Sequence, residues 1–183
     1  MNLNRERVGD WMQTYTGRQF WPIDPRAEEI FIEDIAHALA MQCRYAGHSL
    51  RFYSVAEHCV LLSRAVQPRH ALWALLHDAS EAYLTDVIRP LKPYLQGYKF
   101  REKKVMEAVA KRFDLQGEMP AEVEQADIRI CLDERAQNMA PTGHDWQIKG
   151  GPLGIELQFW SPEVAERMFL DAYYAINWAA AEA

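Results

Sequence analysis

The sequence is poor in cysteine and has no excess of positive charge, and each shortage excludes a class of protein. Its cysteines, Cys43, Cys59 and Cys131, lie far apart and form no CxxC pair, so we expect reduced core thiols and no disulfide framework. The formal net charge is -6, which argues against a nucleic-acid partner, because a broad binding surface needs clustered Lys and Arg. A locally basic pocket for a small phosphorylated ligand is compatible with that charge.

Long apolar runs are also absent. No run approaches the ~18 residues that a membrane-spanning helix needs, and the first residues, MNLNRERVGDWMQ, lack the apolar segment of a signal peptide. We therefore expect a cytoplasmic protein with no membrane partner. Internal repeats are missing, and the hydrophobic content of 49% is sufficient for one domain that spans residues 1–183.

Helical periodicity, interrupted by Pro and Gly, is what the sequence does contain. Ser54 and Glu57 match a capping box in which each side chain binds the other residue's backbone N–H. Residues 17–27 contain two prolines and predict an extended loop, and residues 140–160 predict an irregular connection or a short hairpin. About six helices and little strand predict an all-α fold, with helices at about 29–45, 54–66, from 68 through the stretch ALWALLHDASEAYLTD, 100–113, 120–139 and from 161 onward.

A histidine and an aspartate directly follow an apolar helical run. His77 and Asp78 come after Ala71–Leu76, where a buried helix would ordinarily stay apolar. His58 interrupts a second apolar helix, and Asp127 lies on one helical stripe with Val123 and Ile130. Each position has an ordinary alternative, since a lone inward His is often a satisfied core residue and Asp127 could cap a helix or pair with a nearby Arg.

Together, these polar residues on three predicted helices favour a metal site. Burying such groups without partners is costly, and a cation removes that cost. Two His and two Asp side chains form a mixed N/O ligand set, and this set suits Mn, Co, Ni, Zn, Fe or Mg without selecting one of them.

His58, His77-Asp78 and Asp127 resemble the H…HD…D signature of the HD-domain metal-dependent phosphohydrolases, an all-α superfamily. The segments SVAEHC, LLHDASEAYLTD, IRPLK and EQADIRI look like the small bacterial HD hydrolases of the YfdR type, which are similar to the YfbR-type 5'-deoxynucleotidases. The resemblance covers roughly residues 18–140 and implies an HD-domain helical bundle with one divalent metal ion at its centre. One departure is the gap between His58 and His77, which is much longer in the YfbR-type enzymes.

The resemblance also implies catalytic carboxylates. Glu81 corresponds to the acidic residue that orients or deprotonates the attacking water, and it lies one helical turn after His77. Asp86 resembles the second carboxylate of the family, which protonates the leaving 5'-oxygen or holds the water. Two carboxylates in different environments divide acid and base work. The plain alternatives are a solvated helix residue for Glu81 and a helix N-cap for Asp86.

Substrate contacts are expected from cations and aromatic rings. Arg44 lies where the YfbR-type enzymes place a phosphate-contacting Arg, with Tyr45 as the following aromatic, and Arg offers a planar charged fork for phosphate. Further candidates are Lys92 and His48 for the phosphate, and Trp21 and Ile23 for an apolar slot that holds a base or sugar. The cations could equally be ordinary surface residues, and Trp21 could pack back onto its own domain.

The resemblance therefore implies a phosphohydrolase that acts on (deoxy)nucleoside 5'-monophosphates. A dNTP triphosphohydrolase acting on a nucleotide such as dATP would use the same metal site. A catalytically silent nucleotide-binding protein is an alternative of a different class, and Glu81 and Asp86 disfavour it because a purely structural site does not need them.

The last predicted helix carries apolar residues on more than one face. We expect Val164, Met168, Ala172 and Ala175 to point inward. The remaining aromatic residues leave two interpretations open, a homodimer interface or a terminal helix docked on its own core.

Overall fold

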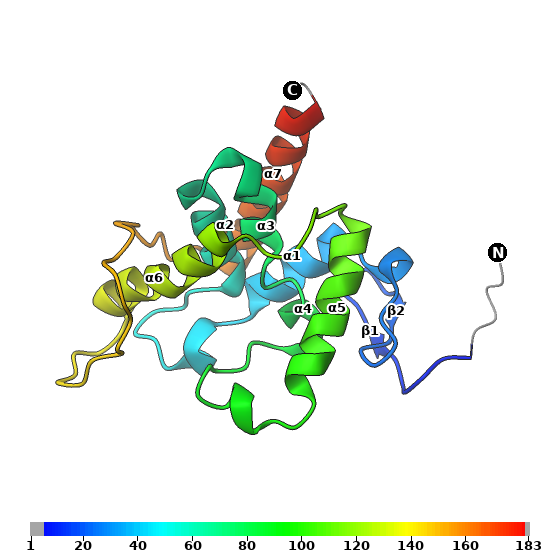
Figure 1. The fold of residues 1–183 in the computed structure, drawn as a ribbon, viewed down its shortest axis with the longest axis horizontal. Coiled ribbons are helices and arrows are strands. Elements are labelled where there is room, and N and C mark those ends of the chain that lie inside the picture. Colours follow the sequence, from blue (N-terminus) through cyan, green and yellow to red (C-terminus); the bar gives the residue numbers. More distant parts are fainter. Residues whose placement is uncertain (1–5, 182–183) are drawn as a thin grey trace.

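The computed structural model describes residues 6–181, and nearly all of their regular structure is helical (Figure 1). This confirms the all-α prediction. Short 3-10 turns lie at Ala27–Glu29, Arg44–Gly47, Pro68–His70 and Lys92–Tyr94. The α-helices are α1 (Ile32–Met41), α2 (Val55–Ala65), α3 (Ala71–Leu76), α4 (Glu81–Leu84), α5 (Tyr98–Arg112), α6 (Ala121–Asn138) and α7 (Pro162–Ala181).

A two-stranded antiparallel sheet precedes the helices. Strand β1 (Met12–Gln13) pairs with β2 (Gln19–Phe20), and Met12 lies opposite Phe20. The short hairpin therefore lies near the N-terminus, where an extended loop was expected. Residues 140–160, the other place considered for a hairpin, contain no helix or strand.

Two predicted helices are shorter in the structure than in the sequence pattern. The helix expected over 29–45 ends at Met41, because Cys43 pairs with Ser54 in an isolated β-bridge and Tyr45 and Ala46 adopt left-handed backbone angles. The helix that carries the apolar run ends at Leu76, and residues 77–80 form a turn before α4. His77 and Asp78 therefore lie in a tight turn instead of on a continuous helix.

Helix α2 is the centre of the bundle. Every residue from Val55 to Ser63 is buried, because α1, α3 and α7 all pack against this helix. On its other side, α6 and residues 153–159 cover Tyr53 and Leu62 in a second apolar cluster. Side chains on every face of α2 therefore point into the interior of the molecule.

Two buried carboxylates hold the irregular segment 151–160 in place. Glu57 on α2 accepts hydrogen bonds from the backbone N–H groups of residues 158, 159 and 160 at 2.7–2.8 Å. Asp133 on α6 accepts from the N–H groups of residues 153, 154 and 155 at 2.7–3.1 Å. A segment without a strand partner thereby satisfies its buried backbone donors.

The predicted capping box is therefore only half correct. Ser54 Oγ accepts the hydrogen bond from the Glu57 N–H at 3.0 Å, which begins α2 as expected. The Glu57 carboxylate does not return to Ser54, because it binds the 158–160 backbone instead.

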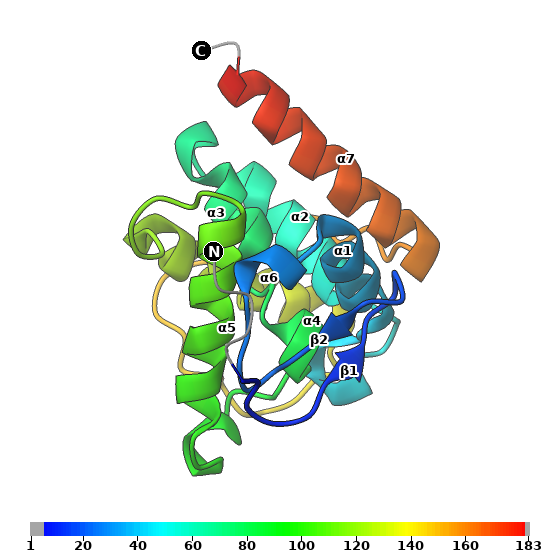
Figure 2. The ribbon, with the colours of Figure 1, turned by 90° about the vertical axis from the view of Figure 1, so that its right-hand side faces the viewer.

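Helix α7 packs against α1, α2 and α3 with its first half, and Figure 2 shows its C-terminal half extending past the other helices. Its buried residues are Ala165 and Phe169, each one position after an expected inward residue. Ala172 packs against the core as expected, whereas Ala175 is exposed. Tyr174 and Trp178 are 55% and 70% exposed. A homodimer formed through this end of α7 stays a prediction. Among the described residues, no helix combines the length and hydrophobicity that crossing a bilayer requires.

Candidate functional site

Four of the polar residues singled out in the sequence come together in space. His58 comes from the first turn of α2, His77 and Asp78 from the turn after α3, and Asp127 from α6. His58 is fully buried, and the side chain of His77 is only 4% exposed. His58, His77 and Asp127 are a group that could hold a metal ion, with ligand atoms within 4.8 Å of one another.

The converging atoms are the Nε2 atoms of the two histidines and one oxygen from each aspartate. The two Nε2 atoms are 3.3 Å apart. Asp127 Oδ1 lies 3.2 Å from His58 Nε2 and 3.6 Å from His77 Nε2. Asp78 Oδ2 lies 3.2 Å from His77 Nε2 and 3.8 Å from His58 Nε2. Two ligand atoms that are each about 2.1 Å from one ion lie about 3.0–3.4 Å apart at right or tetrahedral angles, so the observed separations suit a shared cation.

The second ring nitrogen of each histidine is already engaged with an acceptor. His58 Nδ1 lies 2.7 Å from Glu134 Oε1, and His77 Nδ1 lies 2.8 Å from the carbonyl oxygen of Ala74. A carboxylate and a carbonyl only accept hydrogen bonds, so each Nδ1 donates its proton. Each neutral ring then turns the lone pair of Nε2 toward the other ring and toward the carboxylates. Four acceptors that face one another require a cation, and the residues therefore fit a metal ion.

The protonation behaviour of the site agrees with this charge pattern. Burial opposes a charge on His77, but the negative charge of Asp78, the neighbouring Cys59 and a hydrogen bond with Asp127 together outweigh burial and raise the pKa of His77. Burial opposes the charge on Asp78 as well, and the charge of His77 lowers the pKa of Asp78 to about 2. The site thus attracts positive charge strongly, and extra protons supply it where no cation is present.

Sequence reasoning missed Glu134, which lies behind the histidines on α6. Its side chain is fully buried. Oε1 accepts the proton of His58 Nδ1, while Oε2 accepts hydrogen bonds from Arg44 Nη2 at 3.2 Å and from the Tyr45 hydroxyl. Burial opposes its charge, and Arg44 and His58 outweigh burial and lower the pKa of Glu134 to about 2. Glu134 follows Asp127 by seven residues, which places both on one face of the helix, and that spacing is the signal that could have identified it.

Arg44 joins Glu134 to the cation site. Its Nη1 lies 3.7 Å from Asp78 Oδ2, and only 11% of its side chain is exposed. The 3-10 turn that carries Arg44 is strained, because Tyr45 and Ala46 have φ of 57° and 51°. Left-handed angles at residues other than Gly cost about 1–2 kcal/mol each and persist where the surroundings hold them. Here the bonds to Glu134 hold the turn.

A cavity of about 570 Å³ opens beside these residues. Most of the residues expected to act on or bind a substrate line it. They are Arg44, Tyr45, His48, Asp78, Glu81, Asp86, Lys92 and Asp127. Sequence reasoning did not identify the other lining residues, Val87, Ile88, Arg89, Pro90, Cys131, Met139, Trp146 and Ile148.

Trp21 and Ile23 are not among these lining residues, so their expected role stays a prediction that this cavity does not support. The guanidinium of Arg7 lies over the Trp21 ring at 4.1 Å, so this Trp packs within the N-terminal segment. The apolar and aromatic wall of the cavity comes instead from Val87, Ile88 and the 146–148 segment. Asp127 also lacks the arginine partners considered for it, because Arg129 donates to the backbone oxygens of residues 151 and 152.

Glu81 has a strongly perturbed carboxyl group on the cavity wall. It is only 4% exposed, its Oε1 lies 3.4 Å from Lys92 Nζ, and its buried Oε2 has no hydrogen-bond partner. Burial first, and then the charges of Asp78 and Asp86, raise its pKa to about 9. The pKa of Asp86 is also raised, mainly by burial. A strongly perturbed carboxyl in a cavity is typical of a group that transfers protons.

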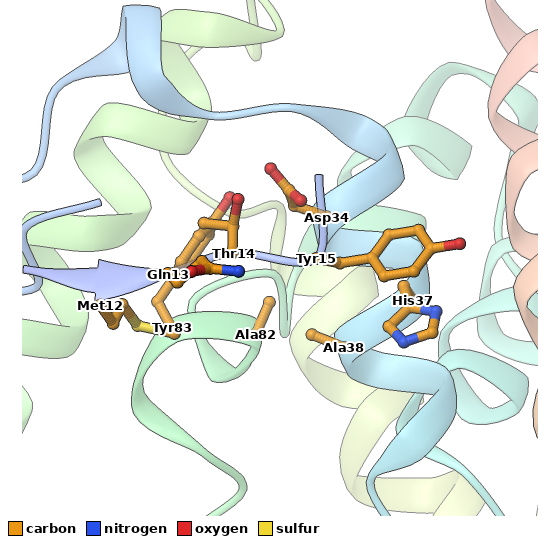
Figure 3. Close-up of a pocket in the computed structure, with 9 residues that line it drawn as sticks. All are labelled: Met12, Gln13, Thr14, Tyr15, Asp34, His37, Ala38, Ala82 and Tyr83. Atoms are coloured by element: carbon orange, nitrogen blue, oxygen red, sulfur yellow. The ribbon is translucent and has the colours of Figure 1, made fainter. Parts of the chain in front are cut away.

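A second cavity, of about 260 Å³, lies on α1, α4 and the N-terminal hairpin. Figure 3 shows the Tyr15 ring lying against His37, and the two rings stack at 3.6 Å. Two of its polar groups are already paired, because His37 binds Glu166 and Asp34 accepts from Thr16. The buried hydroxyl of Tyr83 has no hydrogen-bond partner among the described residues. No Lys or Arg lines this cavity, so we place the candidate site in the larger one.

The fold and the site define an all-α protein in which histidine and aspartate side chains that could hold a metal ion come together on the wall of a cavity. The chain is 37% identical over 147 residues to the uncharacterized protein YfdR of Escherichia coli (strain K12). The aligned region covers 80% of this chain and 83% of YfdR. It belongs to the same family as YfdR. It is also 37% identical over 126 residues to the uncharacterized protein RCAP_rcc00048 of Rhodobacter capsulatus, over 63% of this chain and 64% of that protein. No protein-family model matches the chain.

Proposed function

We propose that this protein is a metal-dependent phosphohydrolase of the HD type that releases phosphate from (deoxy)nucleoside 5'-monophosphates. The observation that carries the proposal is the convergence of four acceptor atoms from His58, His77, Asp78 and Asp127 beside a cavity that also contains Arg44. These four residues would hold one divalent ion, of Mn, Co, Ni, Zn, Fe or Mg. When bound, such an ion polarises a phosphoryl oxygen and lowers the pKa of water from about 15.7 toward 7.

The residues of the chain divide the remaining work. Arg44 already lies 3.7 Å from Asp78, so its fork would contact a phosphate placed beside the ligands. Lys92 lines the same cavity and adds a second positive charge. His48 lies on the wall as a further donor.

Glu81 and Asp86 are the proton carriers in this proposal. The pKa of Glu81 is raised to about 9, so this carboxyl group holds a proton at neutral pH as long as no metal ion is bound. Next to a cation its pKa falls, so the carboxylate can orient an attacking water and accept its proton. Asp86 would protonate the leaving 5'-oxygen. Its raised pKa supports that role, because an acid must still carry its proton near neutral pH.

The experiment is a phosphate-release assay on deoxy- and ribonucleoside 5'-monophosphates with metal-stripped protein and single metals added back. We expect release that depends on the metal and is abolished in His77→Ala. His70→Ala is the matched control, because His70 binds Glu122 away from the cavity, and it should keep full activity. Release that persists after chelation, or in His77→Ala, would contradict the proposal.

Glu81→Gln separates an enzyme from a silent binding protein. If the protein is an enzyme, this variant should bind metal and nucleotide normally and release phosphate at least about 100-fold more slowly. An unchanged rate would remove Glu81 from the mechanism. Binding without any turnover in the wild type would favour a nucleotide sensor.

A dNTP triphosphohydrolase is the second candidate. Arg89, which also lines the cavity, adds a positive charge that a longer phosphate chain would use. The products distinguish the two reactions, since a triphosphohydrolase yields tripolyphosphate from dATP, whereas the proposed enzyme yields inorganic phosphate from dAMP.

A further inference from the structure

The wall of the larger cavity includes an aromatic residue from a segment without regular structure. Trp146 and Ile148 belong to the connection between α6 and α7. They line the same cavity as Asp78 and Asp127. The segment therefore contributes to the candidate site although it lies outside the helices that supply the ligands.

Two aromatic rings lie near each other on this wall. The ring centroids of Tyr45 and Trp146 are 5.7 Å apart, with an interplanar angle of 46°. The rings are tilted, so they do not stack on each other as parallel plates. The cavity that both residues line gives space beside them for a third planar group.

Consecutive residues of α6 hold the two rings. Glu134 accepts the hydrogen bond of the Tyr45 hydroxyl. The Arg135 guanidinium lies 5.5 Å from the centroid of the Trp146 ring, and it also donates to the carbonyl oxygen of His144 and to Asp145. Because α6 also supplies Asp127, one helix sets the position of both rings relative to the cation site.

We propose that Trp146 is a specificity-determining residue whose ring binds the nucleobase of the substrate. This inference rests on the proposed function and deepens it: the cavity would select phosphate esters that carry a planar heteroaromatic ring over sugar phosphates that lack one. Every base has a π-face, so stacking on an indole ring favours any base over none. Val87, Ile88 and Met139 supply the apolar surface that such a ring also needs.

The test compares two probes that share a phosphate and a sugar. They are dAMP and 2-deoxyribose 5-phosphate, and their dissociation constants are measured by calorimetry on the Glu81→Gln protein with metal present. Trp146→Ala should weaken binding of dAMP about 10-fold, the effect of losing ~1.4 kcal/mol of base–aromatic stacking, and leave binding of the sugar phosphate unchanged. Trp146→Phe keeps a ring and should retain most of the affinity.

Trp178→Ala is the matched control, because Trp178 is 70% exposed on α7 and does not line the cavity. It should change neither dissociation constant. In the active enzyme, Trp146→Ala should raise KM for dAMP with kcat nearly unchanged, and circular dichroism checks that the variant is folded.

The outcomes separate this inference from the proposed function. Equal weakening of both probes by Trp146→Ala, or no weakening of either, overturns the role of Trp146 while phosphate release from monophosphates still stands. The same holds if the wild type binds the sugar phosphate as tightly as dAMP. If the wild type neither binds nor hydrolyses any phosphate ester, the proposed function fails and this inference fails with it.

Discussion

Two histidine–glutamate pairs in this protein have nearly the same N–O distance, but one pair is buried and the other is partly exposed. His58 Nδ1 lies 2.7 Å from Glu134, and both side chains are fully buried. His70 Nδ1 lies 2.6 Å from Glu122, and these side chains are 22% and 34% exposed. The buried pair is surrounded by further charges, whereas the second carboxylate oxygen of Glu122 accepts only from the backbone N–H of Gln67.

The difference shows that the contact itself does not determine what such a pair does. Glu134 fixes the ring of His58, and at the same time it fixes Arg44 and Tyr45, so removing it affects the cation site and the cavity wall together. Glu122 connects α6 to the residues before α3 at the surface. Buried charges depend strongly on their partners, and exposed pairs contribute little.

The largest expected effect comes from breaking the buried pair. Glu134→Ala removes the nearer ion-pair partner of the buried Arg44 and leaves the N–H of His58 buried without an acceptor, so we expect the free energy of unfolding to fall by about 3–5 kcal/mol. Glu122→Ala, the matched change at the surface, should cost less than about 1 kcal/mol. Urea unfolding of both variants measures the difference, and equal losses would show that burial does not distinguish the pairs.

The next largest effect is on metal affinity, which should depend on His58 and not on His70. His58→Ala removes a ligand atom, and we expect binding of Mn²⁺ or Co²⁺ to weaken by more than about 100-fold. Glu134→Gln, which loosens the orientation of the same ring, should weaken it about 10- to 100-fold. His70→Ala should leave the affinity unchanged. Titration calorimetry on metal-stripped protein is the measurement, and wild-type affinity in His58→Ala would remove this residue from the ligand set.

A smaller effect concerns the strained turn that the buried pair holds. Ala46 has a φ of 51°, so Ala46→Gly should raise the free energy of unfolding by about 1 kcal/mol, because Gly adopts this conformation without strain. Ala175→Gly, at an exposed position of α7, is the opposite control and should lower it by about 1 kcal/mol. Thermal or urea unfolding gives both values. A loss of stability in Ala46→Gly would mean that the turn stores no strain.

The smallest effect is the pH dependence of the exposed pair. The hydrogen bond from His70 lowers the pKa of Glu122. A carboxyl with a lowered pKa in the folded state stabilises the fold above its ordinary pKa of about 4.3, and this contribution is lost as the pH falls below that value. Glu122→Gln should therefore lower Tm slightly at about pH 6 and have no effect near pH 3. A Tm difference that grows as the pH falls would contradict the assigned sign.

The cation site was accessible to sequence reasoning because its residues break an apolar pattern. His58 and Asp127 occupy helical positions whose neighbours are apolar, and His77 and Asp78 directly follow an apolar run. Helix starts were also predicted well, since Ser54 and Pro120 directly precede α2 and α6. Local sequence is sufficient where capping chemistry or periodicity decides the outcome.

The site residues that sequence reasoning missed are brought into place by long-range contacts, which helical periodicity does not predict. Glu134 stands among other polar residues in LDERAQ, and apart from its seven-residue spacing from Asp127 it looks like part of a solvated helix face. Trp146 lies in a connection with no period at all, and only the fold brings it to the cavity. The role expected for Trp21 and Ile23 has no support from this cavity for the same reason, because a loop sequence does not state which cavity the loop reaches.

The carboxylates of Glu57 and Asp133 have a consequence for the timing of local opening. Together they accept hydrogen bonds from the backbone N–H groups of residues 153–155 and 158–160. We therefore expect these amide protons to exchange with solvent as slowly as those of the helices that carry the two acids. The preceding residues, 142–150, are held from α6 through exposed hydrogen bonds of Arg135 to His144 and Asp145, so we expect their amide protons to exchange faster. The anchored segment thus begins at residue 153, after Trp146 and Ile148 of the cavity wall. A substrate that enters past Trp146 therefore need not disturb the core.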